Sequence, residues 1–79
     1  MNRYNIKVVI PILNKRYEMF VPSNILVGNF IYMLLESIND IHNIKLNNML
    51  LYNSMTGNVL NLDEYIFNSI NNGMTLILA

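Results

Sequence analysis

The longest helical pattern of hydrophobic residues in the chain lies between Pro22 and Ile41. Apolar side chains recur there every three or four positions: Val27, Phe30, Ile31, Leu34, Ile38 and Ile41. The opposite side of the same helix carries Asn29, Tyr32, Glu36 and Asp40. Pro22 breaks the preceding strand, and Ser23 or Asn24 is placed to cap the incoming turn. The pattern therefore predicts one amphipathic helix of about four turns.

In two stretches before this helix, side chains of one face alternate with side chains of the other at a period of two, which predicts strands. One face of residues 4–10 carries Tyr4, Ile6, Val8 and Ile10, and the other carries Asn5, Lys7 and Val9. Residues 17–21 repeat the alternation, with Tyr17, Met19 and Val21 opposed to Glu18 and Phe20. Pro11 weakens the pairing after the first strand, and Asn14-Lys15 predicts a turn. The two strands should therefore form a hairpin.

The second half of the chain contains shorter elements. Residues 42–48 are mostly polar and predict a loop. The pattern then predicts a strand, a turn, a short strand, one helical turn, a second turn and a closing strand: Met49–Asn53, Thr56–Asn58, Val59–Leu60, Leu62–Ile66, Asn71–Gly73 and Met74–Leu78. A crossover helix between hairpin and later strands lets the first and last strands lie parallel at the centre. The expected fold is an α+β β-grasp, a mixed sheet of four to five strands packed on one helix.

Composition narrows the class of protein further. We expect a single domain, 1–79, because a chain this short builds one small core and buries only about 60% of its unfolded surface. Hydrophobic residues make up 53% and charged residues 13%, which indicates a compact globule. The formal net charge is zero, so neither nucleic acid nor an anionic membrane surface is an expected partner.

Membrane insertion and export are also unexpected. The longest apolar run has six residues, whereas a membrane-spanning helix needs about 20. The amino terminus lacks the layout of a signal peptide, because its apolar stretch is short and Pro11 ends it. The chain has no cysteine, which excludes a disulfide scaffold, a thiolate nucleophile and a zinc ribbon. We therefore expect a cytoplasmic protein.

No group of residues in the sequence predicts catalysis, a cofactor or a metal. His42 is the only histidine and is expected on a loop surface without a partner base or second ligand. Asp63 and Glu64 are more typical of a helix amino terminus than of a metal site. Gly28 has no glycine-rich phosphate loop around it. The methionines at 19, 33, 49, 55 and 74 are expected to be mostly core residues. We do not expect an enzyme.

Several segments resemble ubiquitin. V-P-S-N at 21–24 is similar to the end of its second strand, M-L-L-Y at 49–52 to its third strand, and residues 62–73 to its late turn and closing loop. The helix I-L-V-G-N-F-I-Y-M-L-L-E-S-I at 25–38 and the ending N-G-M-T-L-I-L at 72–78 resemble the EsaB/YukD family of small bacterial ubiquitin-like proteins. That family accompanies type VII secretion systems, and the resemblance covers nearly the whole chain.

The resemblance implies a protein that is not conjugated to others. Ubiquitin and the sulfur carriers of its fold act through a terminal Gly-Gly carboxylate, whereas this sequence ends Leu76-Ile77-Leu78-Ala79. The EsaB/YukD family shares this departure. Conjugation and sulfur transfer are therefore not expected, and the family implies an accessory component that works by binding other proteins.

Apolar residues on the solvent side of the predicted strands point to a binding surface. By alternation, Val9, Phe20, Leu50 and Ile77 face away from the helix. On the ubiquitin layout Leu50 falls at the centre of the partner-binding patch, with Ile77 on the neighbouring strand. We expect Leu50, Ile77 and Val9 at the centre of a protein-binding or self-association surface. The outer helix face, with Tyr32, Met33 and Glu36, is a second candidate.

Three functions follow from these features. The first is an accessory of a type VII secretion system that binds a cytosolic domain of a membrane component in assembly or regulation. The second is a free-standing ubiquitin-like adaptor, or homodimer, unrelated to secretion. The third is a small carrier or modifier whose tail is completed by processing, which the intact mass of the native protein would reveal.

Overall fold

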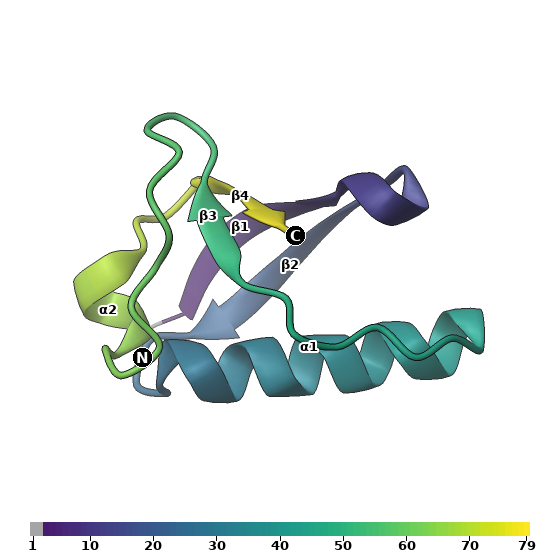
Figure 1. The fold of residues 1–79 in the computed structure, drawn as a ribbon. Helices are drawn as coiled ribbons and strands as arrows, with labels where there is room; N and C mark the ends of the chain where they lie inside the picture. Colours follow the sequence, from purple (N-terminus) through teal and green to yellow (C-terminus); the bar gives the residue numbers. More distant parts are fainter. Residues whose placement is uncertain (1–2) are drawn as a thin grey trace.

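Residues 3–79 are described by a computed structural model (Figure 1). Met1 and Asn2, which the predicted domain includes, lie outside the described residues. The chain forms, in order, β1 (Arg3–Ile10), a short 3-10 helix η1 (Pro11–Leu13), β2 (Lys15–Pro22), α1 (Val27–His42), β3 (Leu51–Asn53), α2 (Ile66–Ser69) and β4 (Thr75–Leu78).

The four strands form one mixed sheet in the order β2-β1-β4-β3. β1 runs antiparallel to β2 and parallel to β4, and β4 runs antiparallel to β3. Helix α1 lies across one face of this sheet (Figure 1). The first and last strands are thus parallel at the centre of the sheet, which confirms the predicted β-grasp.

The hairpin forms as the alternation predicts, but its connection is tighter. Pro11 begins η1, and Asn14 then adopts a left-handed conformation with φ of 53°. Asparagine tolerates this region better than most residues. The predicted turn at Asn14-Lys15 is therefore shifted by one residue, because Lys15 already pairs with Ile10 as the first residue of β2.

The core lies between α1 and the inner face of the sheet. Its buried residues come from every element except η1: Ile6, Val8, Ile10, Val21, Val27, Phe30, Ile31, Leu34, Ile38, Leu51, Ile66, Ile70, Leu76 and Leu78. Five of the six apolar positions predicted for the helix are buried, but Ile41 is 68% exposed. The row that faces the sheet continues from Ile38 to His42, four residues later, and not to Ile41.

The start of α1 differs from the prediction. The N-cap residue is Leu26, whose side chain makes no capping hydrogen bond. The first helical N–H groups donate instead to carbonyls from a distant loop, Val27 to Glu64 at 2.8 Å and Gly28 to Leu62 at 3.0 Å. These bonds satisfy donors that a helix amino terminus otherwise leaves unpaired. Residues 62–64 thus replace the predicted Ser23 or Asn24 cap.

The elements after α1 are shorter than predicted. The third strand was expected from Met49 but begins at Leu51. Val59 makes only an isolated bridge to Tyr52, so the predicted strand Val59–Leu60 does not form as a separate element.

The helical turn predicted at 62–66 begins only at Ile66, where α2 starts. Asp63 and Glu64 precede it and are not in its first turn. Two of the expected core methionines, Met33 and Met55, are exposed.

Candidate protein-binding surface

The outer face of the sheet carries a row of neighbouring apolar side chains. Val9 of β1 pairs with Ile77 of β4, and Ile77 pairs in turn with Tyr52 of β3. Paired residues on adjacent strands lie about 5 Å apart and point to the same face. The alternating neighbours Val8, Leu76 and Leu51 are completely buried on the helix side. The row Val9–Ile77–Tyr52 therefore crosses three strands on the face opposite α1. Figure 1 shows α1 lying across the other face of the sheet.

Leu50 and Val59 enlarge this row. Leu50 exchanges two backbone hydrogen bonds with Ala79, at 2.8 and 3.0 Å, and so lies diagonal to Ile77 on the same face. Val59, which is 50% exposed, bridges to Tyr52 at the far side of β3. We call Val9, Leu50, Tyr52 and Ile77 the outer patch. Its four side chains are each half-buried.

Charged residues border the outer patch on the β2 side. Arg16 pairs with Val9 at the end of the row, and Lys7 lies two residues before Val9 on the same face. Both are exposed. Glu18 pairs with Lys7 and accepts a hydrogen bond from the Asn5 amide at 3.2 Å. An apolar centre with a charged rim is the usual composition of a protein interface.

Phe20 does not belong to the outer patch. It points to the same face and is 62% exposed, but it pairs with Asn5, four residues before Val9 along β1. The Lys7–Glu18 pair lies between them. The guanidinium of Arg3 sits 5.1 Å from the centre of the Phe20 ring, in a cation–π contact. The structure therefore groups three of the four predicted residues and leaves Phe20 apart.

Tyr52 is the patch residue that sequence reasoning missed. Its side chain belongs to the outer face by the alternation that also assigned Leu50, two residues earlier. The alternation was available in the sequence, whereas the pairing of Tyr52 with Ile77 comes only from the register of β3 on β4.

The outer face of α1 forms a second, more polar surface. Tyr32 and Met33 are 67% and 54% exposed. Beside them a hollow of about 380 Å³ lies between the helix and the loop at 46–48, with Tyr32 and Glu36 among its lining residues. Asn39 holds this loop in place, because its side chain accepts a bond from the Leu46 N–H at 2.8 Å and donates to the Leu46 carbonyl at 2.9 Å.

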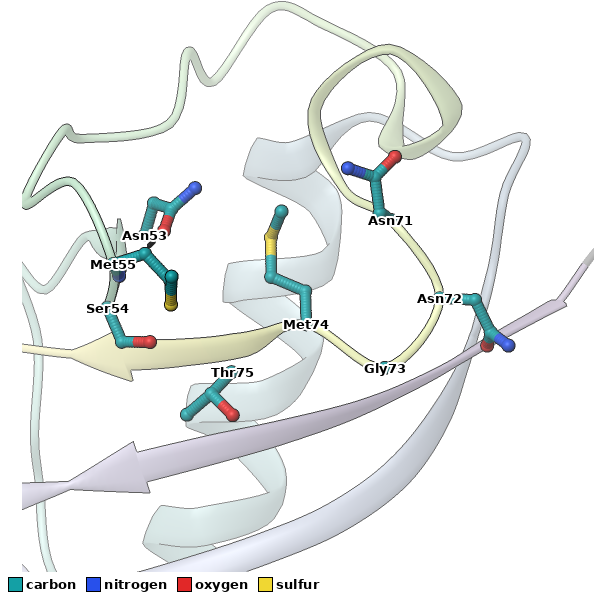
Figure 2. A pocket seen from close by; sticks show the side chains of 8 residues that line it. All are labelled: Asn53, Ser54, Met55, Asn71, Asn72, Gly73, Met74 and Thr75. Carbon is teal, nitrogen blue, oxygen red and sulfur yellow. Dashed lines mark hydrogen bonds between the residues drawn. The ribbon is translucent and has the colours of Figure 1, made fainter.

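A second hollow, of about 300 Å³, lies between the end of β3 and the turn before β4. Figure 2 shows Met74 pointing between Asn53 and Asn71. None of its lining residues is ionisable. The side-chain oxygen of Asn53 accepts a bond from the Met55 N–H, and that of Asn72 accepts one from the Asn5 N–H. The side-chain amides of Asn53 and Asn72 thus stabilise the loops in which they lie.

The side chains considered for catalysis or metal binding do not form one cluster within residues 3–79. His42 ends α1 and is half-buried, not on a loop as predicted, and its Nε2 shares a 2.6 Å hydrogen bond with the Tyr17 hydroxyl. Within residues 3–79 no three histidine or acidic side chains come together in a way that suits a metal ion. None of the helices in this range has the length and apolar character needed to cross a membrane.

Solved structures with the same fold include two from type VII secretion. The chain matches a component of the ESX-5 inner membrane complex with a TM-score of 0.78 and 13% identity, over 98% of this chain and 20% of that chain. It matches the ubiquitin-like domain of the Mycobacterium tuberculosis type VII secretion system protein EccD1 with a TM-score of 0.74 and 10% identity, over 99% and 98% of the two chains. The chain therefore spans about a fifth of the ESX-5 component.

A ubiquitin is also among the similar structures. The Caldiarchaeum subterraneum ubiquitin matches with a TM-score of 0.68 and 18% identity, over 98% of this chain and 91% of that one. No family model and no curated protein matches the sequence. At these identities the comparisons show the fold, and the chain has the ubiquitin-like β-grasp.

Proposed function

We propose that this chain is a cytoplasmic, non-conjugated ubiquitin-like accessory protein of a bacterial type VII secretion system, related to the EsaB/YukD proteins. It acts by binding a cytosolic part of the apparatus, in assembly or regulation. The single observation that carries protein binding is the outer patch, in which Val9, Leu50, Tyr52 and Ile77 gather on an open sheet face. The likeness to the EccD1 domain supports the secretion context.

The closing strand β4 belongs to the sheet on which the outer patch lies. Leu76 and Leu78 are completely buried and Ala79 pairs with Leu50. The strand that presents Ile77 to the outer patch is therefore held in the sheet.

The test is a pull-down from native cells with the partners identified by mass spectrometry. Wild type is compared with Leu50→Asp/Ile77→Lys, which adds opposite charges to the centre of the outer patch. The matched control, Ile12→Lys/Met55→Lys, changes two side chains that are 68% and 90% exposed outside the patch. Circular dichroism verifies that every variant is folded.

We expect secretion-apparatus proteins with wild type and control, and none with the patch variant. Equal recovery with all three proteins would contradict the outer patch as the binding site. In that case Met33→Lys tests the outer face of α1. Recovery of nothing but the protein itself would contradict the secretion role and favour a free-standing adaptor or homodimer.

A further inference from the structure

The two edges of the sheet are covered to different degrees. β3 is flanked by the segment after its turn, because the Asn53 N–H donates to the Asn58 carbonyl at 2.9 Å and the Leu60 N–H to the Leu51 carbonyl at 2.9 Å. β2 is the other outermost strand and is eight residues long. Within residues 3–79 no strand pairs with its outer side. A long open edge is a template for another strand.

The backbone pattern identifies the groups on this edge. The N–H of Lys7 donates to Met74, and the carbonyl of Asn5 accepts from Gly73, so these β1 residues direct their backbone groups toward β4. Their neighbours Ile6 and Val8 therefore face β2 and bond with Met19 and Tyr17.

The alternate residues of β2, which are Arg16, Glu18 and Phe20, then direct both N–H and C=O outward. Pro22 is the next in this series, and proline is tolerated there because its missing N–H would also face outward.

We propose that two copies of this chain associate through antiparallel pairing of their β2 edges, with Arg16 of each copy opposite Glu18 of the other. The pairing is two-fold symmetric about Tyr17 and joins two four-stranded sheets into one of eight strands. It uses the edge of the sheet and not the outer patch, so it is independent of the proposed binding role. Each Arg16–Glu18 pair exchanges two backbone hydrogen bonds, giving four across the two-fold axis.

Charge complementarity selects the register and the partner. With Arg16 opposite Glu18 of the second copy, two opposite-charge pairs form on the outer face, and such pairs stabilise a sheet. A shift to Glu18 opposite Glu18 puts like charges together, which is destabilising. A further shift places Glu18 opposite Phe20 and gives no charge pair. The β2 edge is thus complementary in charge to a second copy of itself, as the interface of a symmetric dimer requires.

The inner face of β2 is also incomplete in one copy. Tyr17 and Met19 of this outermost strand pack against the core, but both are only half-buried. In the proposed pairing Tyr17 lies opposite Tyr17 of the second copy on the inner face. Antiparallel pairing therefore covers apolar side-chain area that the single chain leaves open.

Amide hydrogen exchange measured by NMR over a range of protein concentrations tests the pairing at single residues. Within residues 3–79 of one copy, the N–H groups of Arg16 and Glu18 have no strand partner, whereas those of Tyr17 and Met19 bond to β1. We expect exchange at Arg16 and Glu18 to slow as the concentration rises, while Tyr17 and Met19 stay protected throughout. Exchange at Arg16 and Glu18 that does not change with concentration would overturn the proposal.

Charge reversal tests the register by sedimentation equilibrium. Arg16→Glu and Glu18→Arg each create two like-charge pairs, so each should shift the protein to monomer. The double variant Arg16→Glu/Glu18→Arg restores opposite charges and should self-associate as the wild type does. A double variant that stays monomeric while its circular dichroism is native would overturn the proposed register. Met55→Lys is the control, because Met55 is 90% exposed after β3, at the opposite edge of the sheet, and its replacement should leave self-association unchanged.

Discussion

At the scale of single residues, asparagine shapes much of the chain outside its regular elements. Asn14, Asn43 and Asn48 adopt positive φ, and Asn43 ends α1 by donating its N–H to the Asn39 carbonyl. The sequence indicates such turn positions, because asparagine favours turns and helix ends. It does not indicate which asparagine side chain bonds a distant backbone, as Asn39 does with Leu46.

Replacing Asn39 with leucine should destabilise the protein. The leucine side chain is similar in size but leaves the N–H and C=O of Leu46 without their part-buried partners. We expect the free energy of unfolding to fall by about 1–3 kcal/mol, the cost of unsatisfied buried polar groups. Urea denaturation measures the change. Asn29→Ala, an exposed position in the same helix, is the control and should alter stability by no more than about 0.5 kcal/mol. An Asn39→Leu variant as stable as this control would contradict the role of Asn39.

At the scale of elements, the local sequence pattern predicted those helices and strands that depend on residues close together in the sequence. The hairpin, α1 and β4 follow from alternation and helical spacing, and they formed within a few residues of their predicted bounds. The start of α1 did not follow, because its first N–H groups bond to Leu62 and Glu64. These carbonyls are more than 30 positions away in the sequence. The sequence likewise predicted a strand at Val59, but Val59 forms only an isolated bridge to Tyr52.

Gly28 should resist replacement by alanine although it lies inside a helix. Helix propensity alone favours alanine over glycine by about 1 kcal/mol. However, a Cβ at Gly28 would lie 3.2 Å from the carbonyl oxygen of Leu62, which bonds the Gly28 N–H. We expect crowding to reverse the sign, so that Gly28→Ala lowers the unfolding free energy by about 1 kcal/mol. Thermal unfolding measures the effect, with Ser37→Ala as the control on the exposed side of α1. A stabilised Gly28→Ala variant would show that the loop yields at no cost.

At the scale of the whole molecule, the sheet separates a core face, which α1 covers, from an open outer face (Figure 1). Alternation correctly predicted that Val9, Leu50 and Ile77 point away from the helix. Alternation could not predict how far along the sheet each residue lies. A period of two shows only which face a side chain occupies, whereas its position along the sheet depends on how the strands pair. Phe20 illustrates the difference, since it shares the face but pairs with Asn5 at the other end of β1.

Photocrosslinking in native cells tests the outer patch most directly. A photoreactive amino acid replaces Lys7, an exposed residue on the patch border, so that the patch itself is unchanged. A second strain carries it at Ser37, an exposed residue of α1. We predict a covalent adduct with a secretion-apparatus protein from position 7 and none from position 37. An adduct from position 37 alone, or none from either position, would contradict binding through the outer face of the sheet.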